Sequence, residues 1–97
     1  MERRKIGNSS VEIAPIVFGG NVLGWTVDQA RGFRILDAFI DAGFNAIYTA
    51  DTYSRWNPGN KGGESETIIG NWLAQGGGRR ERVKILTKVG HEMGPAI

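Results

Sequence analysis

Two observations in the sequence predict an α/β fold. Short apolar segments rich in β-branched residues alternate with longer segments in which apolar residues recur at helical intervals. The resulting order is hairpin, strand, helix, strand, helix, strand, and such alternation implies right-handed parallel βαβ units. We therefore expect a parallel sheet that carries helices and is preceded by a small antiparallel hairpin.

The composition is that of one small soluble domain over residues 1–97. The chain has 97 residues, of which 40% are hydrophobic and 23% are charged. A formal net charge of +2 is too small to favour binding to nucleic acid or to a membrane surface. Because the chain has no cysteine and a single histidine, neither a disulfide framework nor a metal site is expected. No signal-like or membrane-spanning apolar segment occurs, so we expect a cytoplasmic protein.

Two elements are indicated at the start of the chain. The segments RKIG and VEIAP flank the polar turn NSS, and the alternation of Val11 and Ile13 predicts a β-hairpin that Pro15 ends. The next segment, IVFGG at residues 16–20, is β-branched and apolar and ends in paired glycines. These properties are typical of a strand buried on both faces, and we interpret it as the first strand of the sheet.

A helix is predicted over residues 27–42. Thr26 and Gln29 have the spacing of a capping box at its start. Gly43 supplies the left-handed stop, and Phe44 is placed to contact the last turn. The apolar face of this helix consists of Ala30, Phe33, Leu36, Phe39 and Ile40.

The rest of the chain predicts two further strands and one helix. Residues 44–50 form the second strand, and the polar loop at residues 51–64 is longer than a simple connection requires. Ser65 is positioned to cap a helix over residues 66–74, and the third strand follows over residues 83–88. The apolar stripe of the second helix consists of Ile68, Ile69, Trp72 and Leu73.

Three arginines, Arg79, Arg80 and Arg82, follow the second predicted helix. They could bind phosphate. Sites for single-stranded nucleic acid, however, combine basic residues with aromatic ones, and no aromatic residue lies between these arginines. A solvated loop is the preferred interpretation. The segment FGGNVLG lacks the spacing G-x-G-x-x-G, which disfavours a Rossmann phosphate loop.

Polar groups collect where the predicted strands end. Gly19 and Gly20 close the first strand, Asp51 and Tyr53 follow the second, and Lys88 ends the third. The carboxyl ends of parallel strands meet at one edge of a sheet, and ligands and catalytic groups gather at that edge. Tyr53 alone would more often be a half-buried structural phenol, and Lys88 alone a solvated strand end. Their coincidence at neighbouring strand ends favours a chemical role.

Several segments together resemble the aldo-keto reductase family. The similarity runs in the family's order through IGNSSVEIAPIVFGGNVLG, DAGFNAIYTADTYS, GGESETIIGNWL and ILTKVG. The resemblance implies a partial (β/α)8 TIM barrel: a hairpin that plugs the barrel over residues 1–14, then the first βα units over residues 15–97, with three of the eight strands. A whole barrel needs roughly 250 residues, so the chain is expected to be the first part of one. Family members use NADPH, without a metal, to reduce aldehydes and ketones.

The resemblance also implies roles for individual residues. Tyr53 matches the family's catalytic tyrosine, which acts as general acid toward the carbonyl oxygen. Lys88 matches the lysine whose cation stabilises the phenolate. Gly20, Asn21 and Val22 match the segment beside the nicotinamide ribose, where glycine permits close approach.

The sequence departs from the family pattern at two places. Tyr48 stands where the family has the aspartate that pairs with the lysine. The ring of Tyr48 is expected beside Lys88, in the space where the nicotinamide ribose should lie. We therefore count Tyr48 with the coenzyme-binding positions. Asp51 is no obvious substitute, because an odd shift along a strand turns a side chain to the other face. His91 follows the lysine too closely to replace the family's catalytic histidine.

Three more residues near this edge each have two possible roles. Trp25 and Trp56 could wall a substrate pocket or could be ordinary packing residues. Glu66 matches an acid of the family pattern, and its preferred role is structural, as an acid in the first turn that favours the helix dipole.

The leading hypothesis is thus an NADPH-dependent oxidoreductase that reduces a small-molecule carbonyl substrate, with the 97-residue chain inactive by itself. The alternative is a binding or assembly module that keeps the partial barrel for interaction, because unpaired strand edges invite pairing with another chain. Self-association of the isolated chain is expected on the same ground.

Overall fold

The computed structural model describes residues 2–89 and has the predicted order of elements. Strands β3, β4 and β5 form a parallel sheet in that order, and β1 pairs with β2 in a separate antiparallel hairpin. The elements are β1 (Arg4–Lys5), β2 (Glu12–Ile13), β3 (Val17–Gly19), the 3-10 helix η1 (Gly20–Val22), α1 (Gln29–Asp41), β4 (Ala46–Tyr48), α2 (Glu64–Ala74), α3 (Arg79–Arg82) and β5 (Lys84–Leu86).

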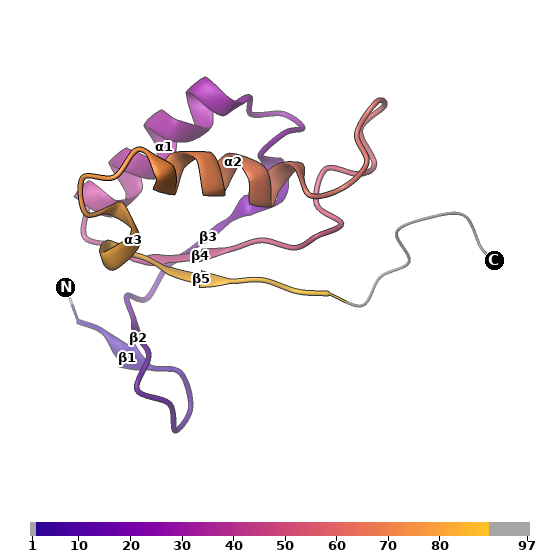
Figure 1. The fold of residues 1–97 in the computed structure, drawn as a ribbon. Coiled ribbons are helices and arrows are strands. Elements are labelled where there is room, and N and C mark those ends of the chain that lie inside the picture. Colours follow the sequence, from indigo (N-terminus) through magenta and orange to yellow (C-terminus); the bar gives the residue numbers. More distant parts are fainter. Residues whose placement is uncertain (1, 90–97) are drawn as a thin grey trace.

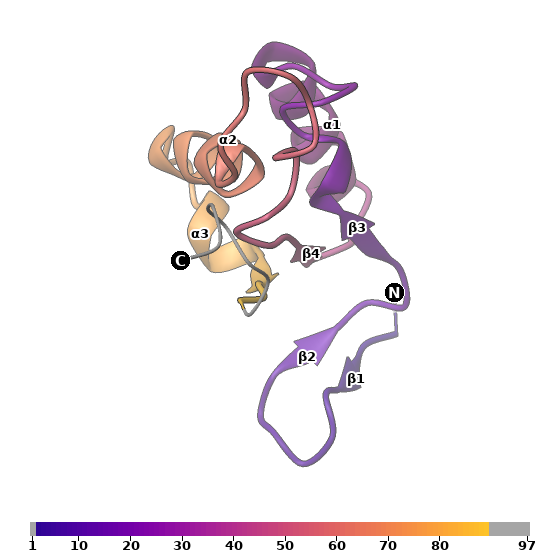
Figure 2. The ribbon, with the colours of Figure 1, turned by 90° about the vertical axis from the view of Figure 1, so that its right-hand side faces the viewer.

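Helices α1 and α2 lie on one face of the sheet, and the hairpin lies on the opposite side, near the amino ends of the strands (Figures 1 and 2). Phe18, Ile47 and Ile85 occupy matching register positions on the three strands and pack toward the helices. Burial of apolar side chains between the sheet and the two helices therefore stabilises the arrangement. The fully or almost fully buried core consists of Leu23, Leu36, Ile40, Ile47, Ile68, Ile69, Trp72 and Val83.

Strand β3 is only partly buried along its length, so the expectation of a strand buried on both faces is wrong. The reason is that the described helices cover only one face of the sheet (Figure 2). The side chains at alternate positions face the other way, and Tyr48 on β4 is 36% exposed.

Helix α1 begins two residues later than predicted and ends one residue earlier, at Asp41. The carboxylate of Asp28, rather than Thr26, caps it, because Asp28 Oδ1 accepts from the amide of Arg31 at 2.9 Å. Ala30 is exposed, contrary to the predicted apolar face. At the other end, Gly43 takes the left-handed conformation with φ of 97°, and the ring of Phe44 stacks on that of Phe39, with the centroids 5.1 Å apart.

Helix α2 begins at Glu64, with Gly63 in the N-cap position at φ of 83°. The expected cap by Ser65 is wrong, because Ser65 lies within the first turn and is fully buried. Instead the carboxylate of Glu64 accepts from the amides of Lys61 and Gly62, which precede the helix. Glu66 lies in the first turn, as predicted, and its carboxylate accepts from the hydroxyl of Thr87 at 2.7 Å.

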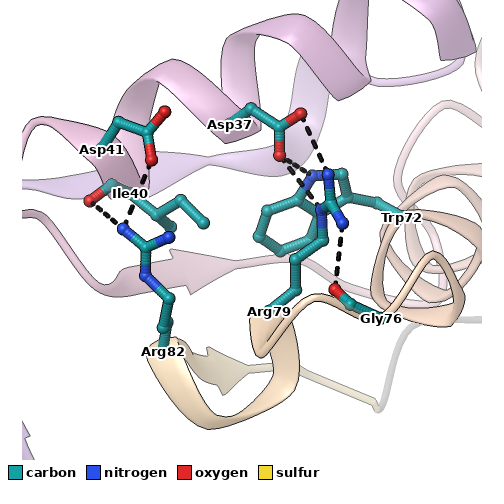
Figure 3. A network of polar contacts seen from close by, with 7 residues as sticks. All are labelled: Asp37, Ile40, Asp41, Trp72, Gly76, Arg79 and Arg82. Atoms are coloured by element: carbon teal, nitrogen blue, oxygen red, sulfur yellow. Dashed lines mark hydrogen bonds and ion pairs between the residues drawn. The ribbon is translucent and has the colours of Figure 1, made fainter.

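The arginine cluster forms the short helix α3 rather than a loop, and Arg79 and Arg82 bind α1 (Figure 3). The loop interpretation is therefore wrong, although Arg80 and Arg82 are solvent-exposed as expected. Arg79 donates to both carboxylate oxygens of Asp37, at 3.1 and 3.3 Å, and Asp37 also accepts from the indole of Trp72 at 2.9 Å. Arg82 lies 3.3 Å from the carboxylate of Asp41. These hydrogen bonds, that from Arg79 foremost, lower the pKa of Asp37 against the opposing effect of burial.

Within residues 2–89, no helix is long and apolar enough to cross a membrane. The same residues contain no group of three or more histidine and acidic side chains that could hold a metal ion. His91 lies outside the described residues.

Candidate active site

Tyr53 and Lys88 meet at the carboxyl edge of the sheet. The ammonium Nζ of Lys88 donates to the hydroxyl Oη of Tyr53 at 2.7 Å, although the residues are 35 positions apart. Backbone contacts beyond the strand ends set this distance, because the amide of Thr49 donates to Leu86 at 2.8 Å and that of Asp51 donates to Lys88 at 3.3 Å. The parallel pairing of β4 with β5 thus continues into the two segments that carry the pair.

The direction of this hydrogen bond decides where the phenol proton points. An ammonium has only donors, so Oη of Tyr53 accepts from Lys88 and its own proton must point elsewhere. No hydrogen bond donated by that O–H is found among residues 2–89. Tyr53 is half-buried and Lys88 is exposed, so the O–H of Tyr53 is available to a ligand oxygen at the mouth of the sheet.

Tyr48 lies beside the same pair, on the face of the sheet that the helices do not cover. Its ring centroid is 5.6 Å from Nζ of Lys88 and 6.1 Å from the ring of Tyr53, in an edge-on arrangement. Nζ also lies 4.7 Å from the centroid of Tyr53, but this distance follows from its hydrogen bond to the hydroxyl and is not a separate interaction.

Lys88 has no acidic partner within residues 2–89, where every ion pair within 4.0 Å involves an arginine. Asp51 does not take the place of the missing carboxylate. Its Oδ1 is buried and accepts no hydrogen bond from the described part of the chain. The main chain of Asp51, by contrast, is bonded on both sides, to Lys88 and to the amide of Gly63 at 2.6 Å.

The segment matched to the nicotinamide ribose forms η1, with Gly20 buried and Asn21 and Val22 partly buried. A Cβ at Gly20 would lie 2.7 Å from the carbonyl oxygen of Tyr48 and 2.9 Å from Oγ of Ser65. Glycine is therefore required at position 20 because other parts of this chain, rather than a ligand, approach its backbone closely.

Sequence reasoning missed the two hydroxyls that hold η1 in place. Ser65 Oγ donates to the carbonyl of Gly20 at 2.6 Å and lies 2.7 Å from Oγ1 of Thr49. Since the one proton of Ser65 goes to Gly20, Thr49 is the donor of the second bond. Both hydroxyls are buried, so strand β4, helix α2 and η1 are joined behind the site. Their partners are distant in sequence, and no local signal could have found them.

Trp25 and Trp56 also gather at this edge and extend an aromatic row from Tyr53. The ring of Trp56 is 6.1 Å from that of Tyr53 and 5.6 Å from that of Trp25, with edge-on geometry in both contacts. Trp25 is 48% exposed and Trp56 49% exposed. The structure therefore makes them surface residues at the site rather than core packing residues.

The loop that carries Tyr53 and Trp56 is anchored by Ser54 and Asn60, which sequence reasoning also missed. Ser54 adopts φ of 70°, unusual for a residue with a side chain, and its hydroxyl donates to the carbonyl of Leu23. The amide of Asn60 donates to the carbonyls of Gly24 and Ser54, both at 2.9 Å. These bonds fix the loop against the segment that carries Trp25.

Comparisons with known proteins assign this arrangement to a family. The model of the aldo/keto reductase family matches residues 15–96. The uncharacterized 11.2 kDa protein in the crtE 3′ region of Pseudescherichia vulneris is 55% identical over 93 residues, covering 96% of this chain and 90% of that protein. The uncharacterized oxidoreductase YrpG of Bacillus subtilis is 38% identical over 89 residues, covering 92% of this chain and 26% of YrpG.

Solved structures agree with this assignment. Aldo-keto reductase AKR11C1 from Bacillus halodurans, in its holo form, is similar at a TM-score of 0.75 with 32% sequence identity, and the match covers 98% of this chain and 28% of that enzyme. This chain thus spans about a quarter of YrpG and of AKR11C1. The predicted fold, the first part of a (β/α)8 barrel, is confirmed. The chain belongs to the aldo/keto reductase family.

Proposed function

We propose that this chain carries the proton-transfer half of an oxidoreductase of the aldo/keto reductase type, which reduces an aldehyde or ketone to an alcohol with NADPH. The observation that supports this most directly is the hydrogen bond of 2.7 Å from Lys88 to Tyr53 at the carboxyl edge of the sheet. Names of relatives support the reaction class, since YrpG is called an oxidoreductase and a relative from Aspergillus flavus is called norsolorinic acid reductase.

In this proposal the residues of the chain move one proton. In a complete enzyme, bound NADPH would supply the hydride for the carbonyl carbon. Tyr53 donates its hydroxyl proton to the carbonyl oxygen, so that an alcohol forms and a phenolate remains. The adjacent ammonium of Lys88 stabilises that phenolate until a proton returns from solvent. The exposed rings of Trp25 and Trp56 flank the place of the substrate.

The described residues do not fit the coenzyme as they stand. The phenol of Tyr48 lies against Gly19, so an aromatic ring fills space beside η1 that the nicotinamide ribose is expected to use. Asn21 and Val22 can contact only that end of the coenzyme. We therefore propose that the 97-residue chain is inactive by itself and that Tyr48 contributes to its inactivity.

A second candidate is a non-catalytic module for binding or assembly. It is favoured by the two outer strands of the sheet, β3 and β5, each of which pairs on one side only within residues 2–89. Unpaired edges of this kind can add strands from another chain. Native mass measured together with NADPH-dependent carbonyl reduction separates the candidates, because a stable assembly without turnover favours the module.

The enzymatic proposal is tested in a chimera that joins this chain to the later strands and helices of YrpG and carries Tyr48→Asp. We expect NADPH-dependent reduction of an aromatic aldehyde, and a loss of about 100-fold or more in kcat when Tyr53→Phe is added. Lys84→Met serves as the control, with kcat retained, because Lys84 is exposed at the start of β5, away from the carboxyl edge of the sheet. A folded chimera that binds NADPH but reduces at the same rate with and without Tyr53 would overturn the assignment.

A further inference from the structure

A cavity of about 440 Å³ lies at the amino end of the sheet, at the opposite edge from Tyr53 and Lys88. Four segments form its wall: the start of the hairpin, the turn from α1 to β4, helix α3 and the first residue of β5. Sites for small molecules have volumes of roughly 300 to 1,000 Å³. The charged side chains in the wall are those of Arg3, Asp41, Glu81, Arg82 and Lys84. Such a wall favours a polar, ionised ligand.

One buried side chain, that of Asn45, holds the frame of this cavity. Its Oδ1 accepts from the amide of Ala14 at 2.7 Å, and its Nδ2 donates to the carbonyl of Glu12 at 2.9 Å. The carbonyl of Asn45 accepts from the amide of Lys84 at 2.7 Å. Asn45 is 1% exposed, so its amide group is shielded from competing water. The hairpin, the turn before β4 and the start of β5 are therefore fixed relative to one another without a ligand.

The charges in the wall are only partly balanced from within. Nη2 of Arg82 donates to the carbonyl of Ile40 at 3.1 Å and lies 3.3 Å from Oδ1 of Asp41 (Figure 3). By contrast, no side-chain hydrogen bond or ion pair joins Arg3, Glu81 or Lys84 to another residue of the described part of the chain. Two cations and one carboxylate thus remain for a ligand. The complementary ligand carries negative charge on one part and a hydrogen-bond donor on another.

A phosphate monoester with hydroxyl groups meets both requirements. Its phosphate carries about 1.5 to 2 negative charges at pH 7 and three terminal oxygens, so it can accept from an arginine and a lysine together. The ionised carboxylate of Glu81 is an acceptor only and needs a donor, which a hydroxyl group supplies. Inorganic phosphate would place a second anion in the cavity and leave this acceptor without a partner.

We propose that the cavity at the amino end of the sheet binds a phosphorylated polyhydroxy compound of the size of a sugar phosphate. The phosphate accepts from Arg3 and Lys84, and a hydroxyl group donates to Glu81. The ligand would bridge the hairpin, α3 and β5. This site is separate from the Tyr53–Lys88 pair and needs neither coenzyme nor turnover, so it goes beyond the proposed function and is compatible with either of the two candidates.

The test uses the 97-residue chain and three probes: ribose 5-phosphate, ribose and inorganic phosphate. We expect equilibrium dialysis to show ribose 5-phosphate binding about tenfold more tightly than either comparison compound. The backbone amide resonances of Gly43 and Lys84 at the cavity should shift on binding, and that of Lys88 at the opposite edge should not. Equal binding of ribose 5-phosphate and inorganic phosphate would show an adventitious ion only, and equal binding of ribose would remove the role of the phosphate. Either result would overturn the proposal.

Variants locate the two parts of the ligand. Arg3→Met and Lys84→Met should each weaken the binding of ribose 5-phosphate about tenfold, because each removes one cation. Lys61→Met is the matched control, because Lys61 is also exposed but lies outside the cavity, and the affinity should not change. Glu81→Ala should bring the affinity for ribose 5-phosphate close to that for inorganic phosphate, since the acceptor for the hydroxyl group is gone. Unchanged affinity in both Arg3→Met and Lys84→Met would overturn the proposal.

Discussion

The phenol of Tyr48 lies directly over Gly19: a Cβ at Gly19 would be 3.1 Å from the hydroxyl oxygen of Tyr48 and 3.3 Å from Cζ. The two residues are register partners on β4 and β3, so the pairing of the strands itself brings the ring across the mouth. Lys88 approaches the same ring from the side of β5. A side chain at position 48 can thus affect the lysine and the first strand at once.

Replacement of this phenol by a carboxylate should restore catalysis in a complete barrel. In the chimera with the later part of YrpG, we expect Tyr48→Asp to raise the rate of carbonyl reduction by about 100-fold, because it orients Lys88 and clears space over Gly19. Tyr48→Phe keeps the ring without the hydroxyl and should stay inactive. The check is the steady-state rate with one aromatic aldehyde and NADPH. Equal rates for Tyr48 and its aspartate variant would show that the phenol is tolerated.

The glycine at position 20 should be required for packing rather than for coenzyme binding. In Gly20→Ala the added methyl group would meet the carbonyl of Tyr48 and the hydroxyl of Ser65, both under 3.0 Å away, and we expect a loss of about 1–3 kcal/mol in stability. Gly70→Ala is the control in α2, where a Cβ meets nothing within 4 Å, and it should stabilise the chain by about 0.8–1 kcal/mol. Urea unfolding, monitored by far-UV circular dichroism, gives the midpoint of each variant. A shift of the midpoint in the same direction and by the same amount in both variants would contradict this account.

Elements governed by local signals could be predicted from the sequence. The left-handed stop at Gly43 and the hairpin with its end at Pro15 depend on neighbouring residues, and both are found. The start of α1 was misplaced because Thr26 and Asp28 are both acceptable caps, and backbone bonds hold the preceding residues in a turn that delays the helix, including that from Gly24 to Val27.

Contacts between distant residues explain what the sequence could not reveal. Ser65 resembles a cap in sequence, but its hydroxyl is used by Gly20, 45 positions earlier. Arg79 resembles a solvated base, but its partner Asp37 is 42 positions away. The approach of Lys88 to Tyr53 could be anticipated only because parallel strands end at a common edge and because the order of motifs resembles a known family.

Coenzyme affinity of the 97-residue chain should be below detection. Only the nicotinamide end has matched residues here, namely Gly20, Asn21 and Val22, and the phenol of Tyr48 stands beside them. We expect no saturable change when NADPH fluorescence is titrated with the chain, and clear binding by the chimera under the same conditions. Saturable binding in the micromolar range by the chain alone would contradict this prediction and would strengthen the case for independent activity.

The isolated chain should self-associate or remain partly molten. Strands β3 and β5 are open at their outer edges within the described residues, and the helices cover only one face of the sheet (Figure 2). Exposed Ile16, at 56%, adds apolar surface next to β3. Sedimentation should give a mass above that of the monomer, or calorimetry a broad transition. A strictly monomeric sample with one sharp two-state transition would exclude both forms of the prediction.

Acid should remove the contribution of Asp37 to stability. The hydrogen bond from Arg79, foremost, and that from Trp72 lower the pKa of Asp37 below its usual 3.8, although burial opposes them. A carboxyl group whose pKa is depressed by folding stabilises the fold above the unfolded value, and that stabilisation is lost as the pH falls through the folded value. The contribution is modest, because the side chain of Asp37 is 39% exposed and water screens the ion pair.

We therefore expect Asp37→Asn to lower the urea midpoint at pH 7, with the difference from the parent chain shrinking once the pH falls below about 3.8 and vanishing when Asp37 is protonated. Asparagine keeps an oxygen that can accept from Trp72, so the variant removes mainly the charge that Arg79 binds. Asp41→Asn is the matched control: its carboxylate is 71% exposed in the pair with Arg82, and its loss should change the midpoint little at either pH. A difference between Asp37→Asn and the parent chain that stays constant from pH 7 to pH 2.5 would show that packing, rather than the ion pair, holds α3 against α1.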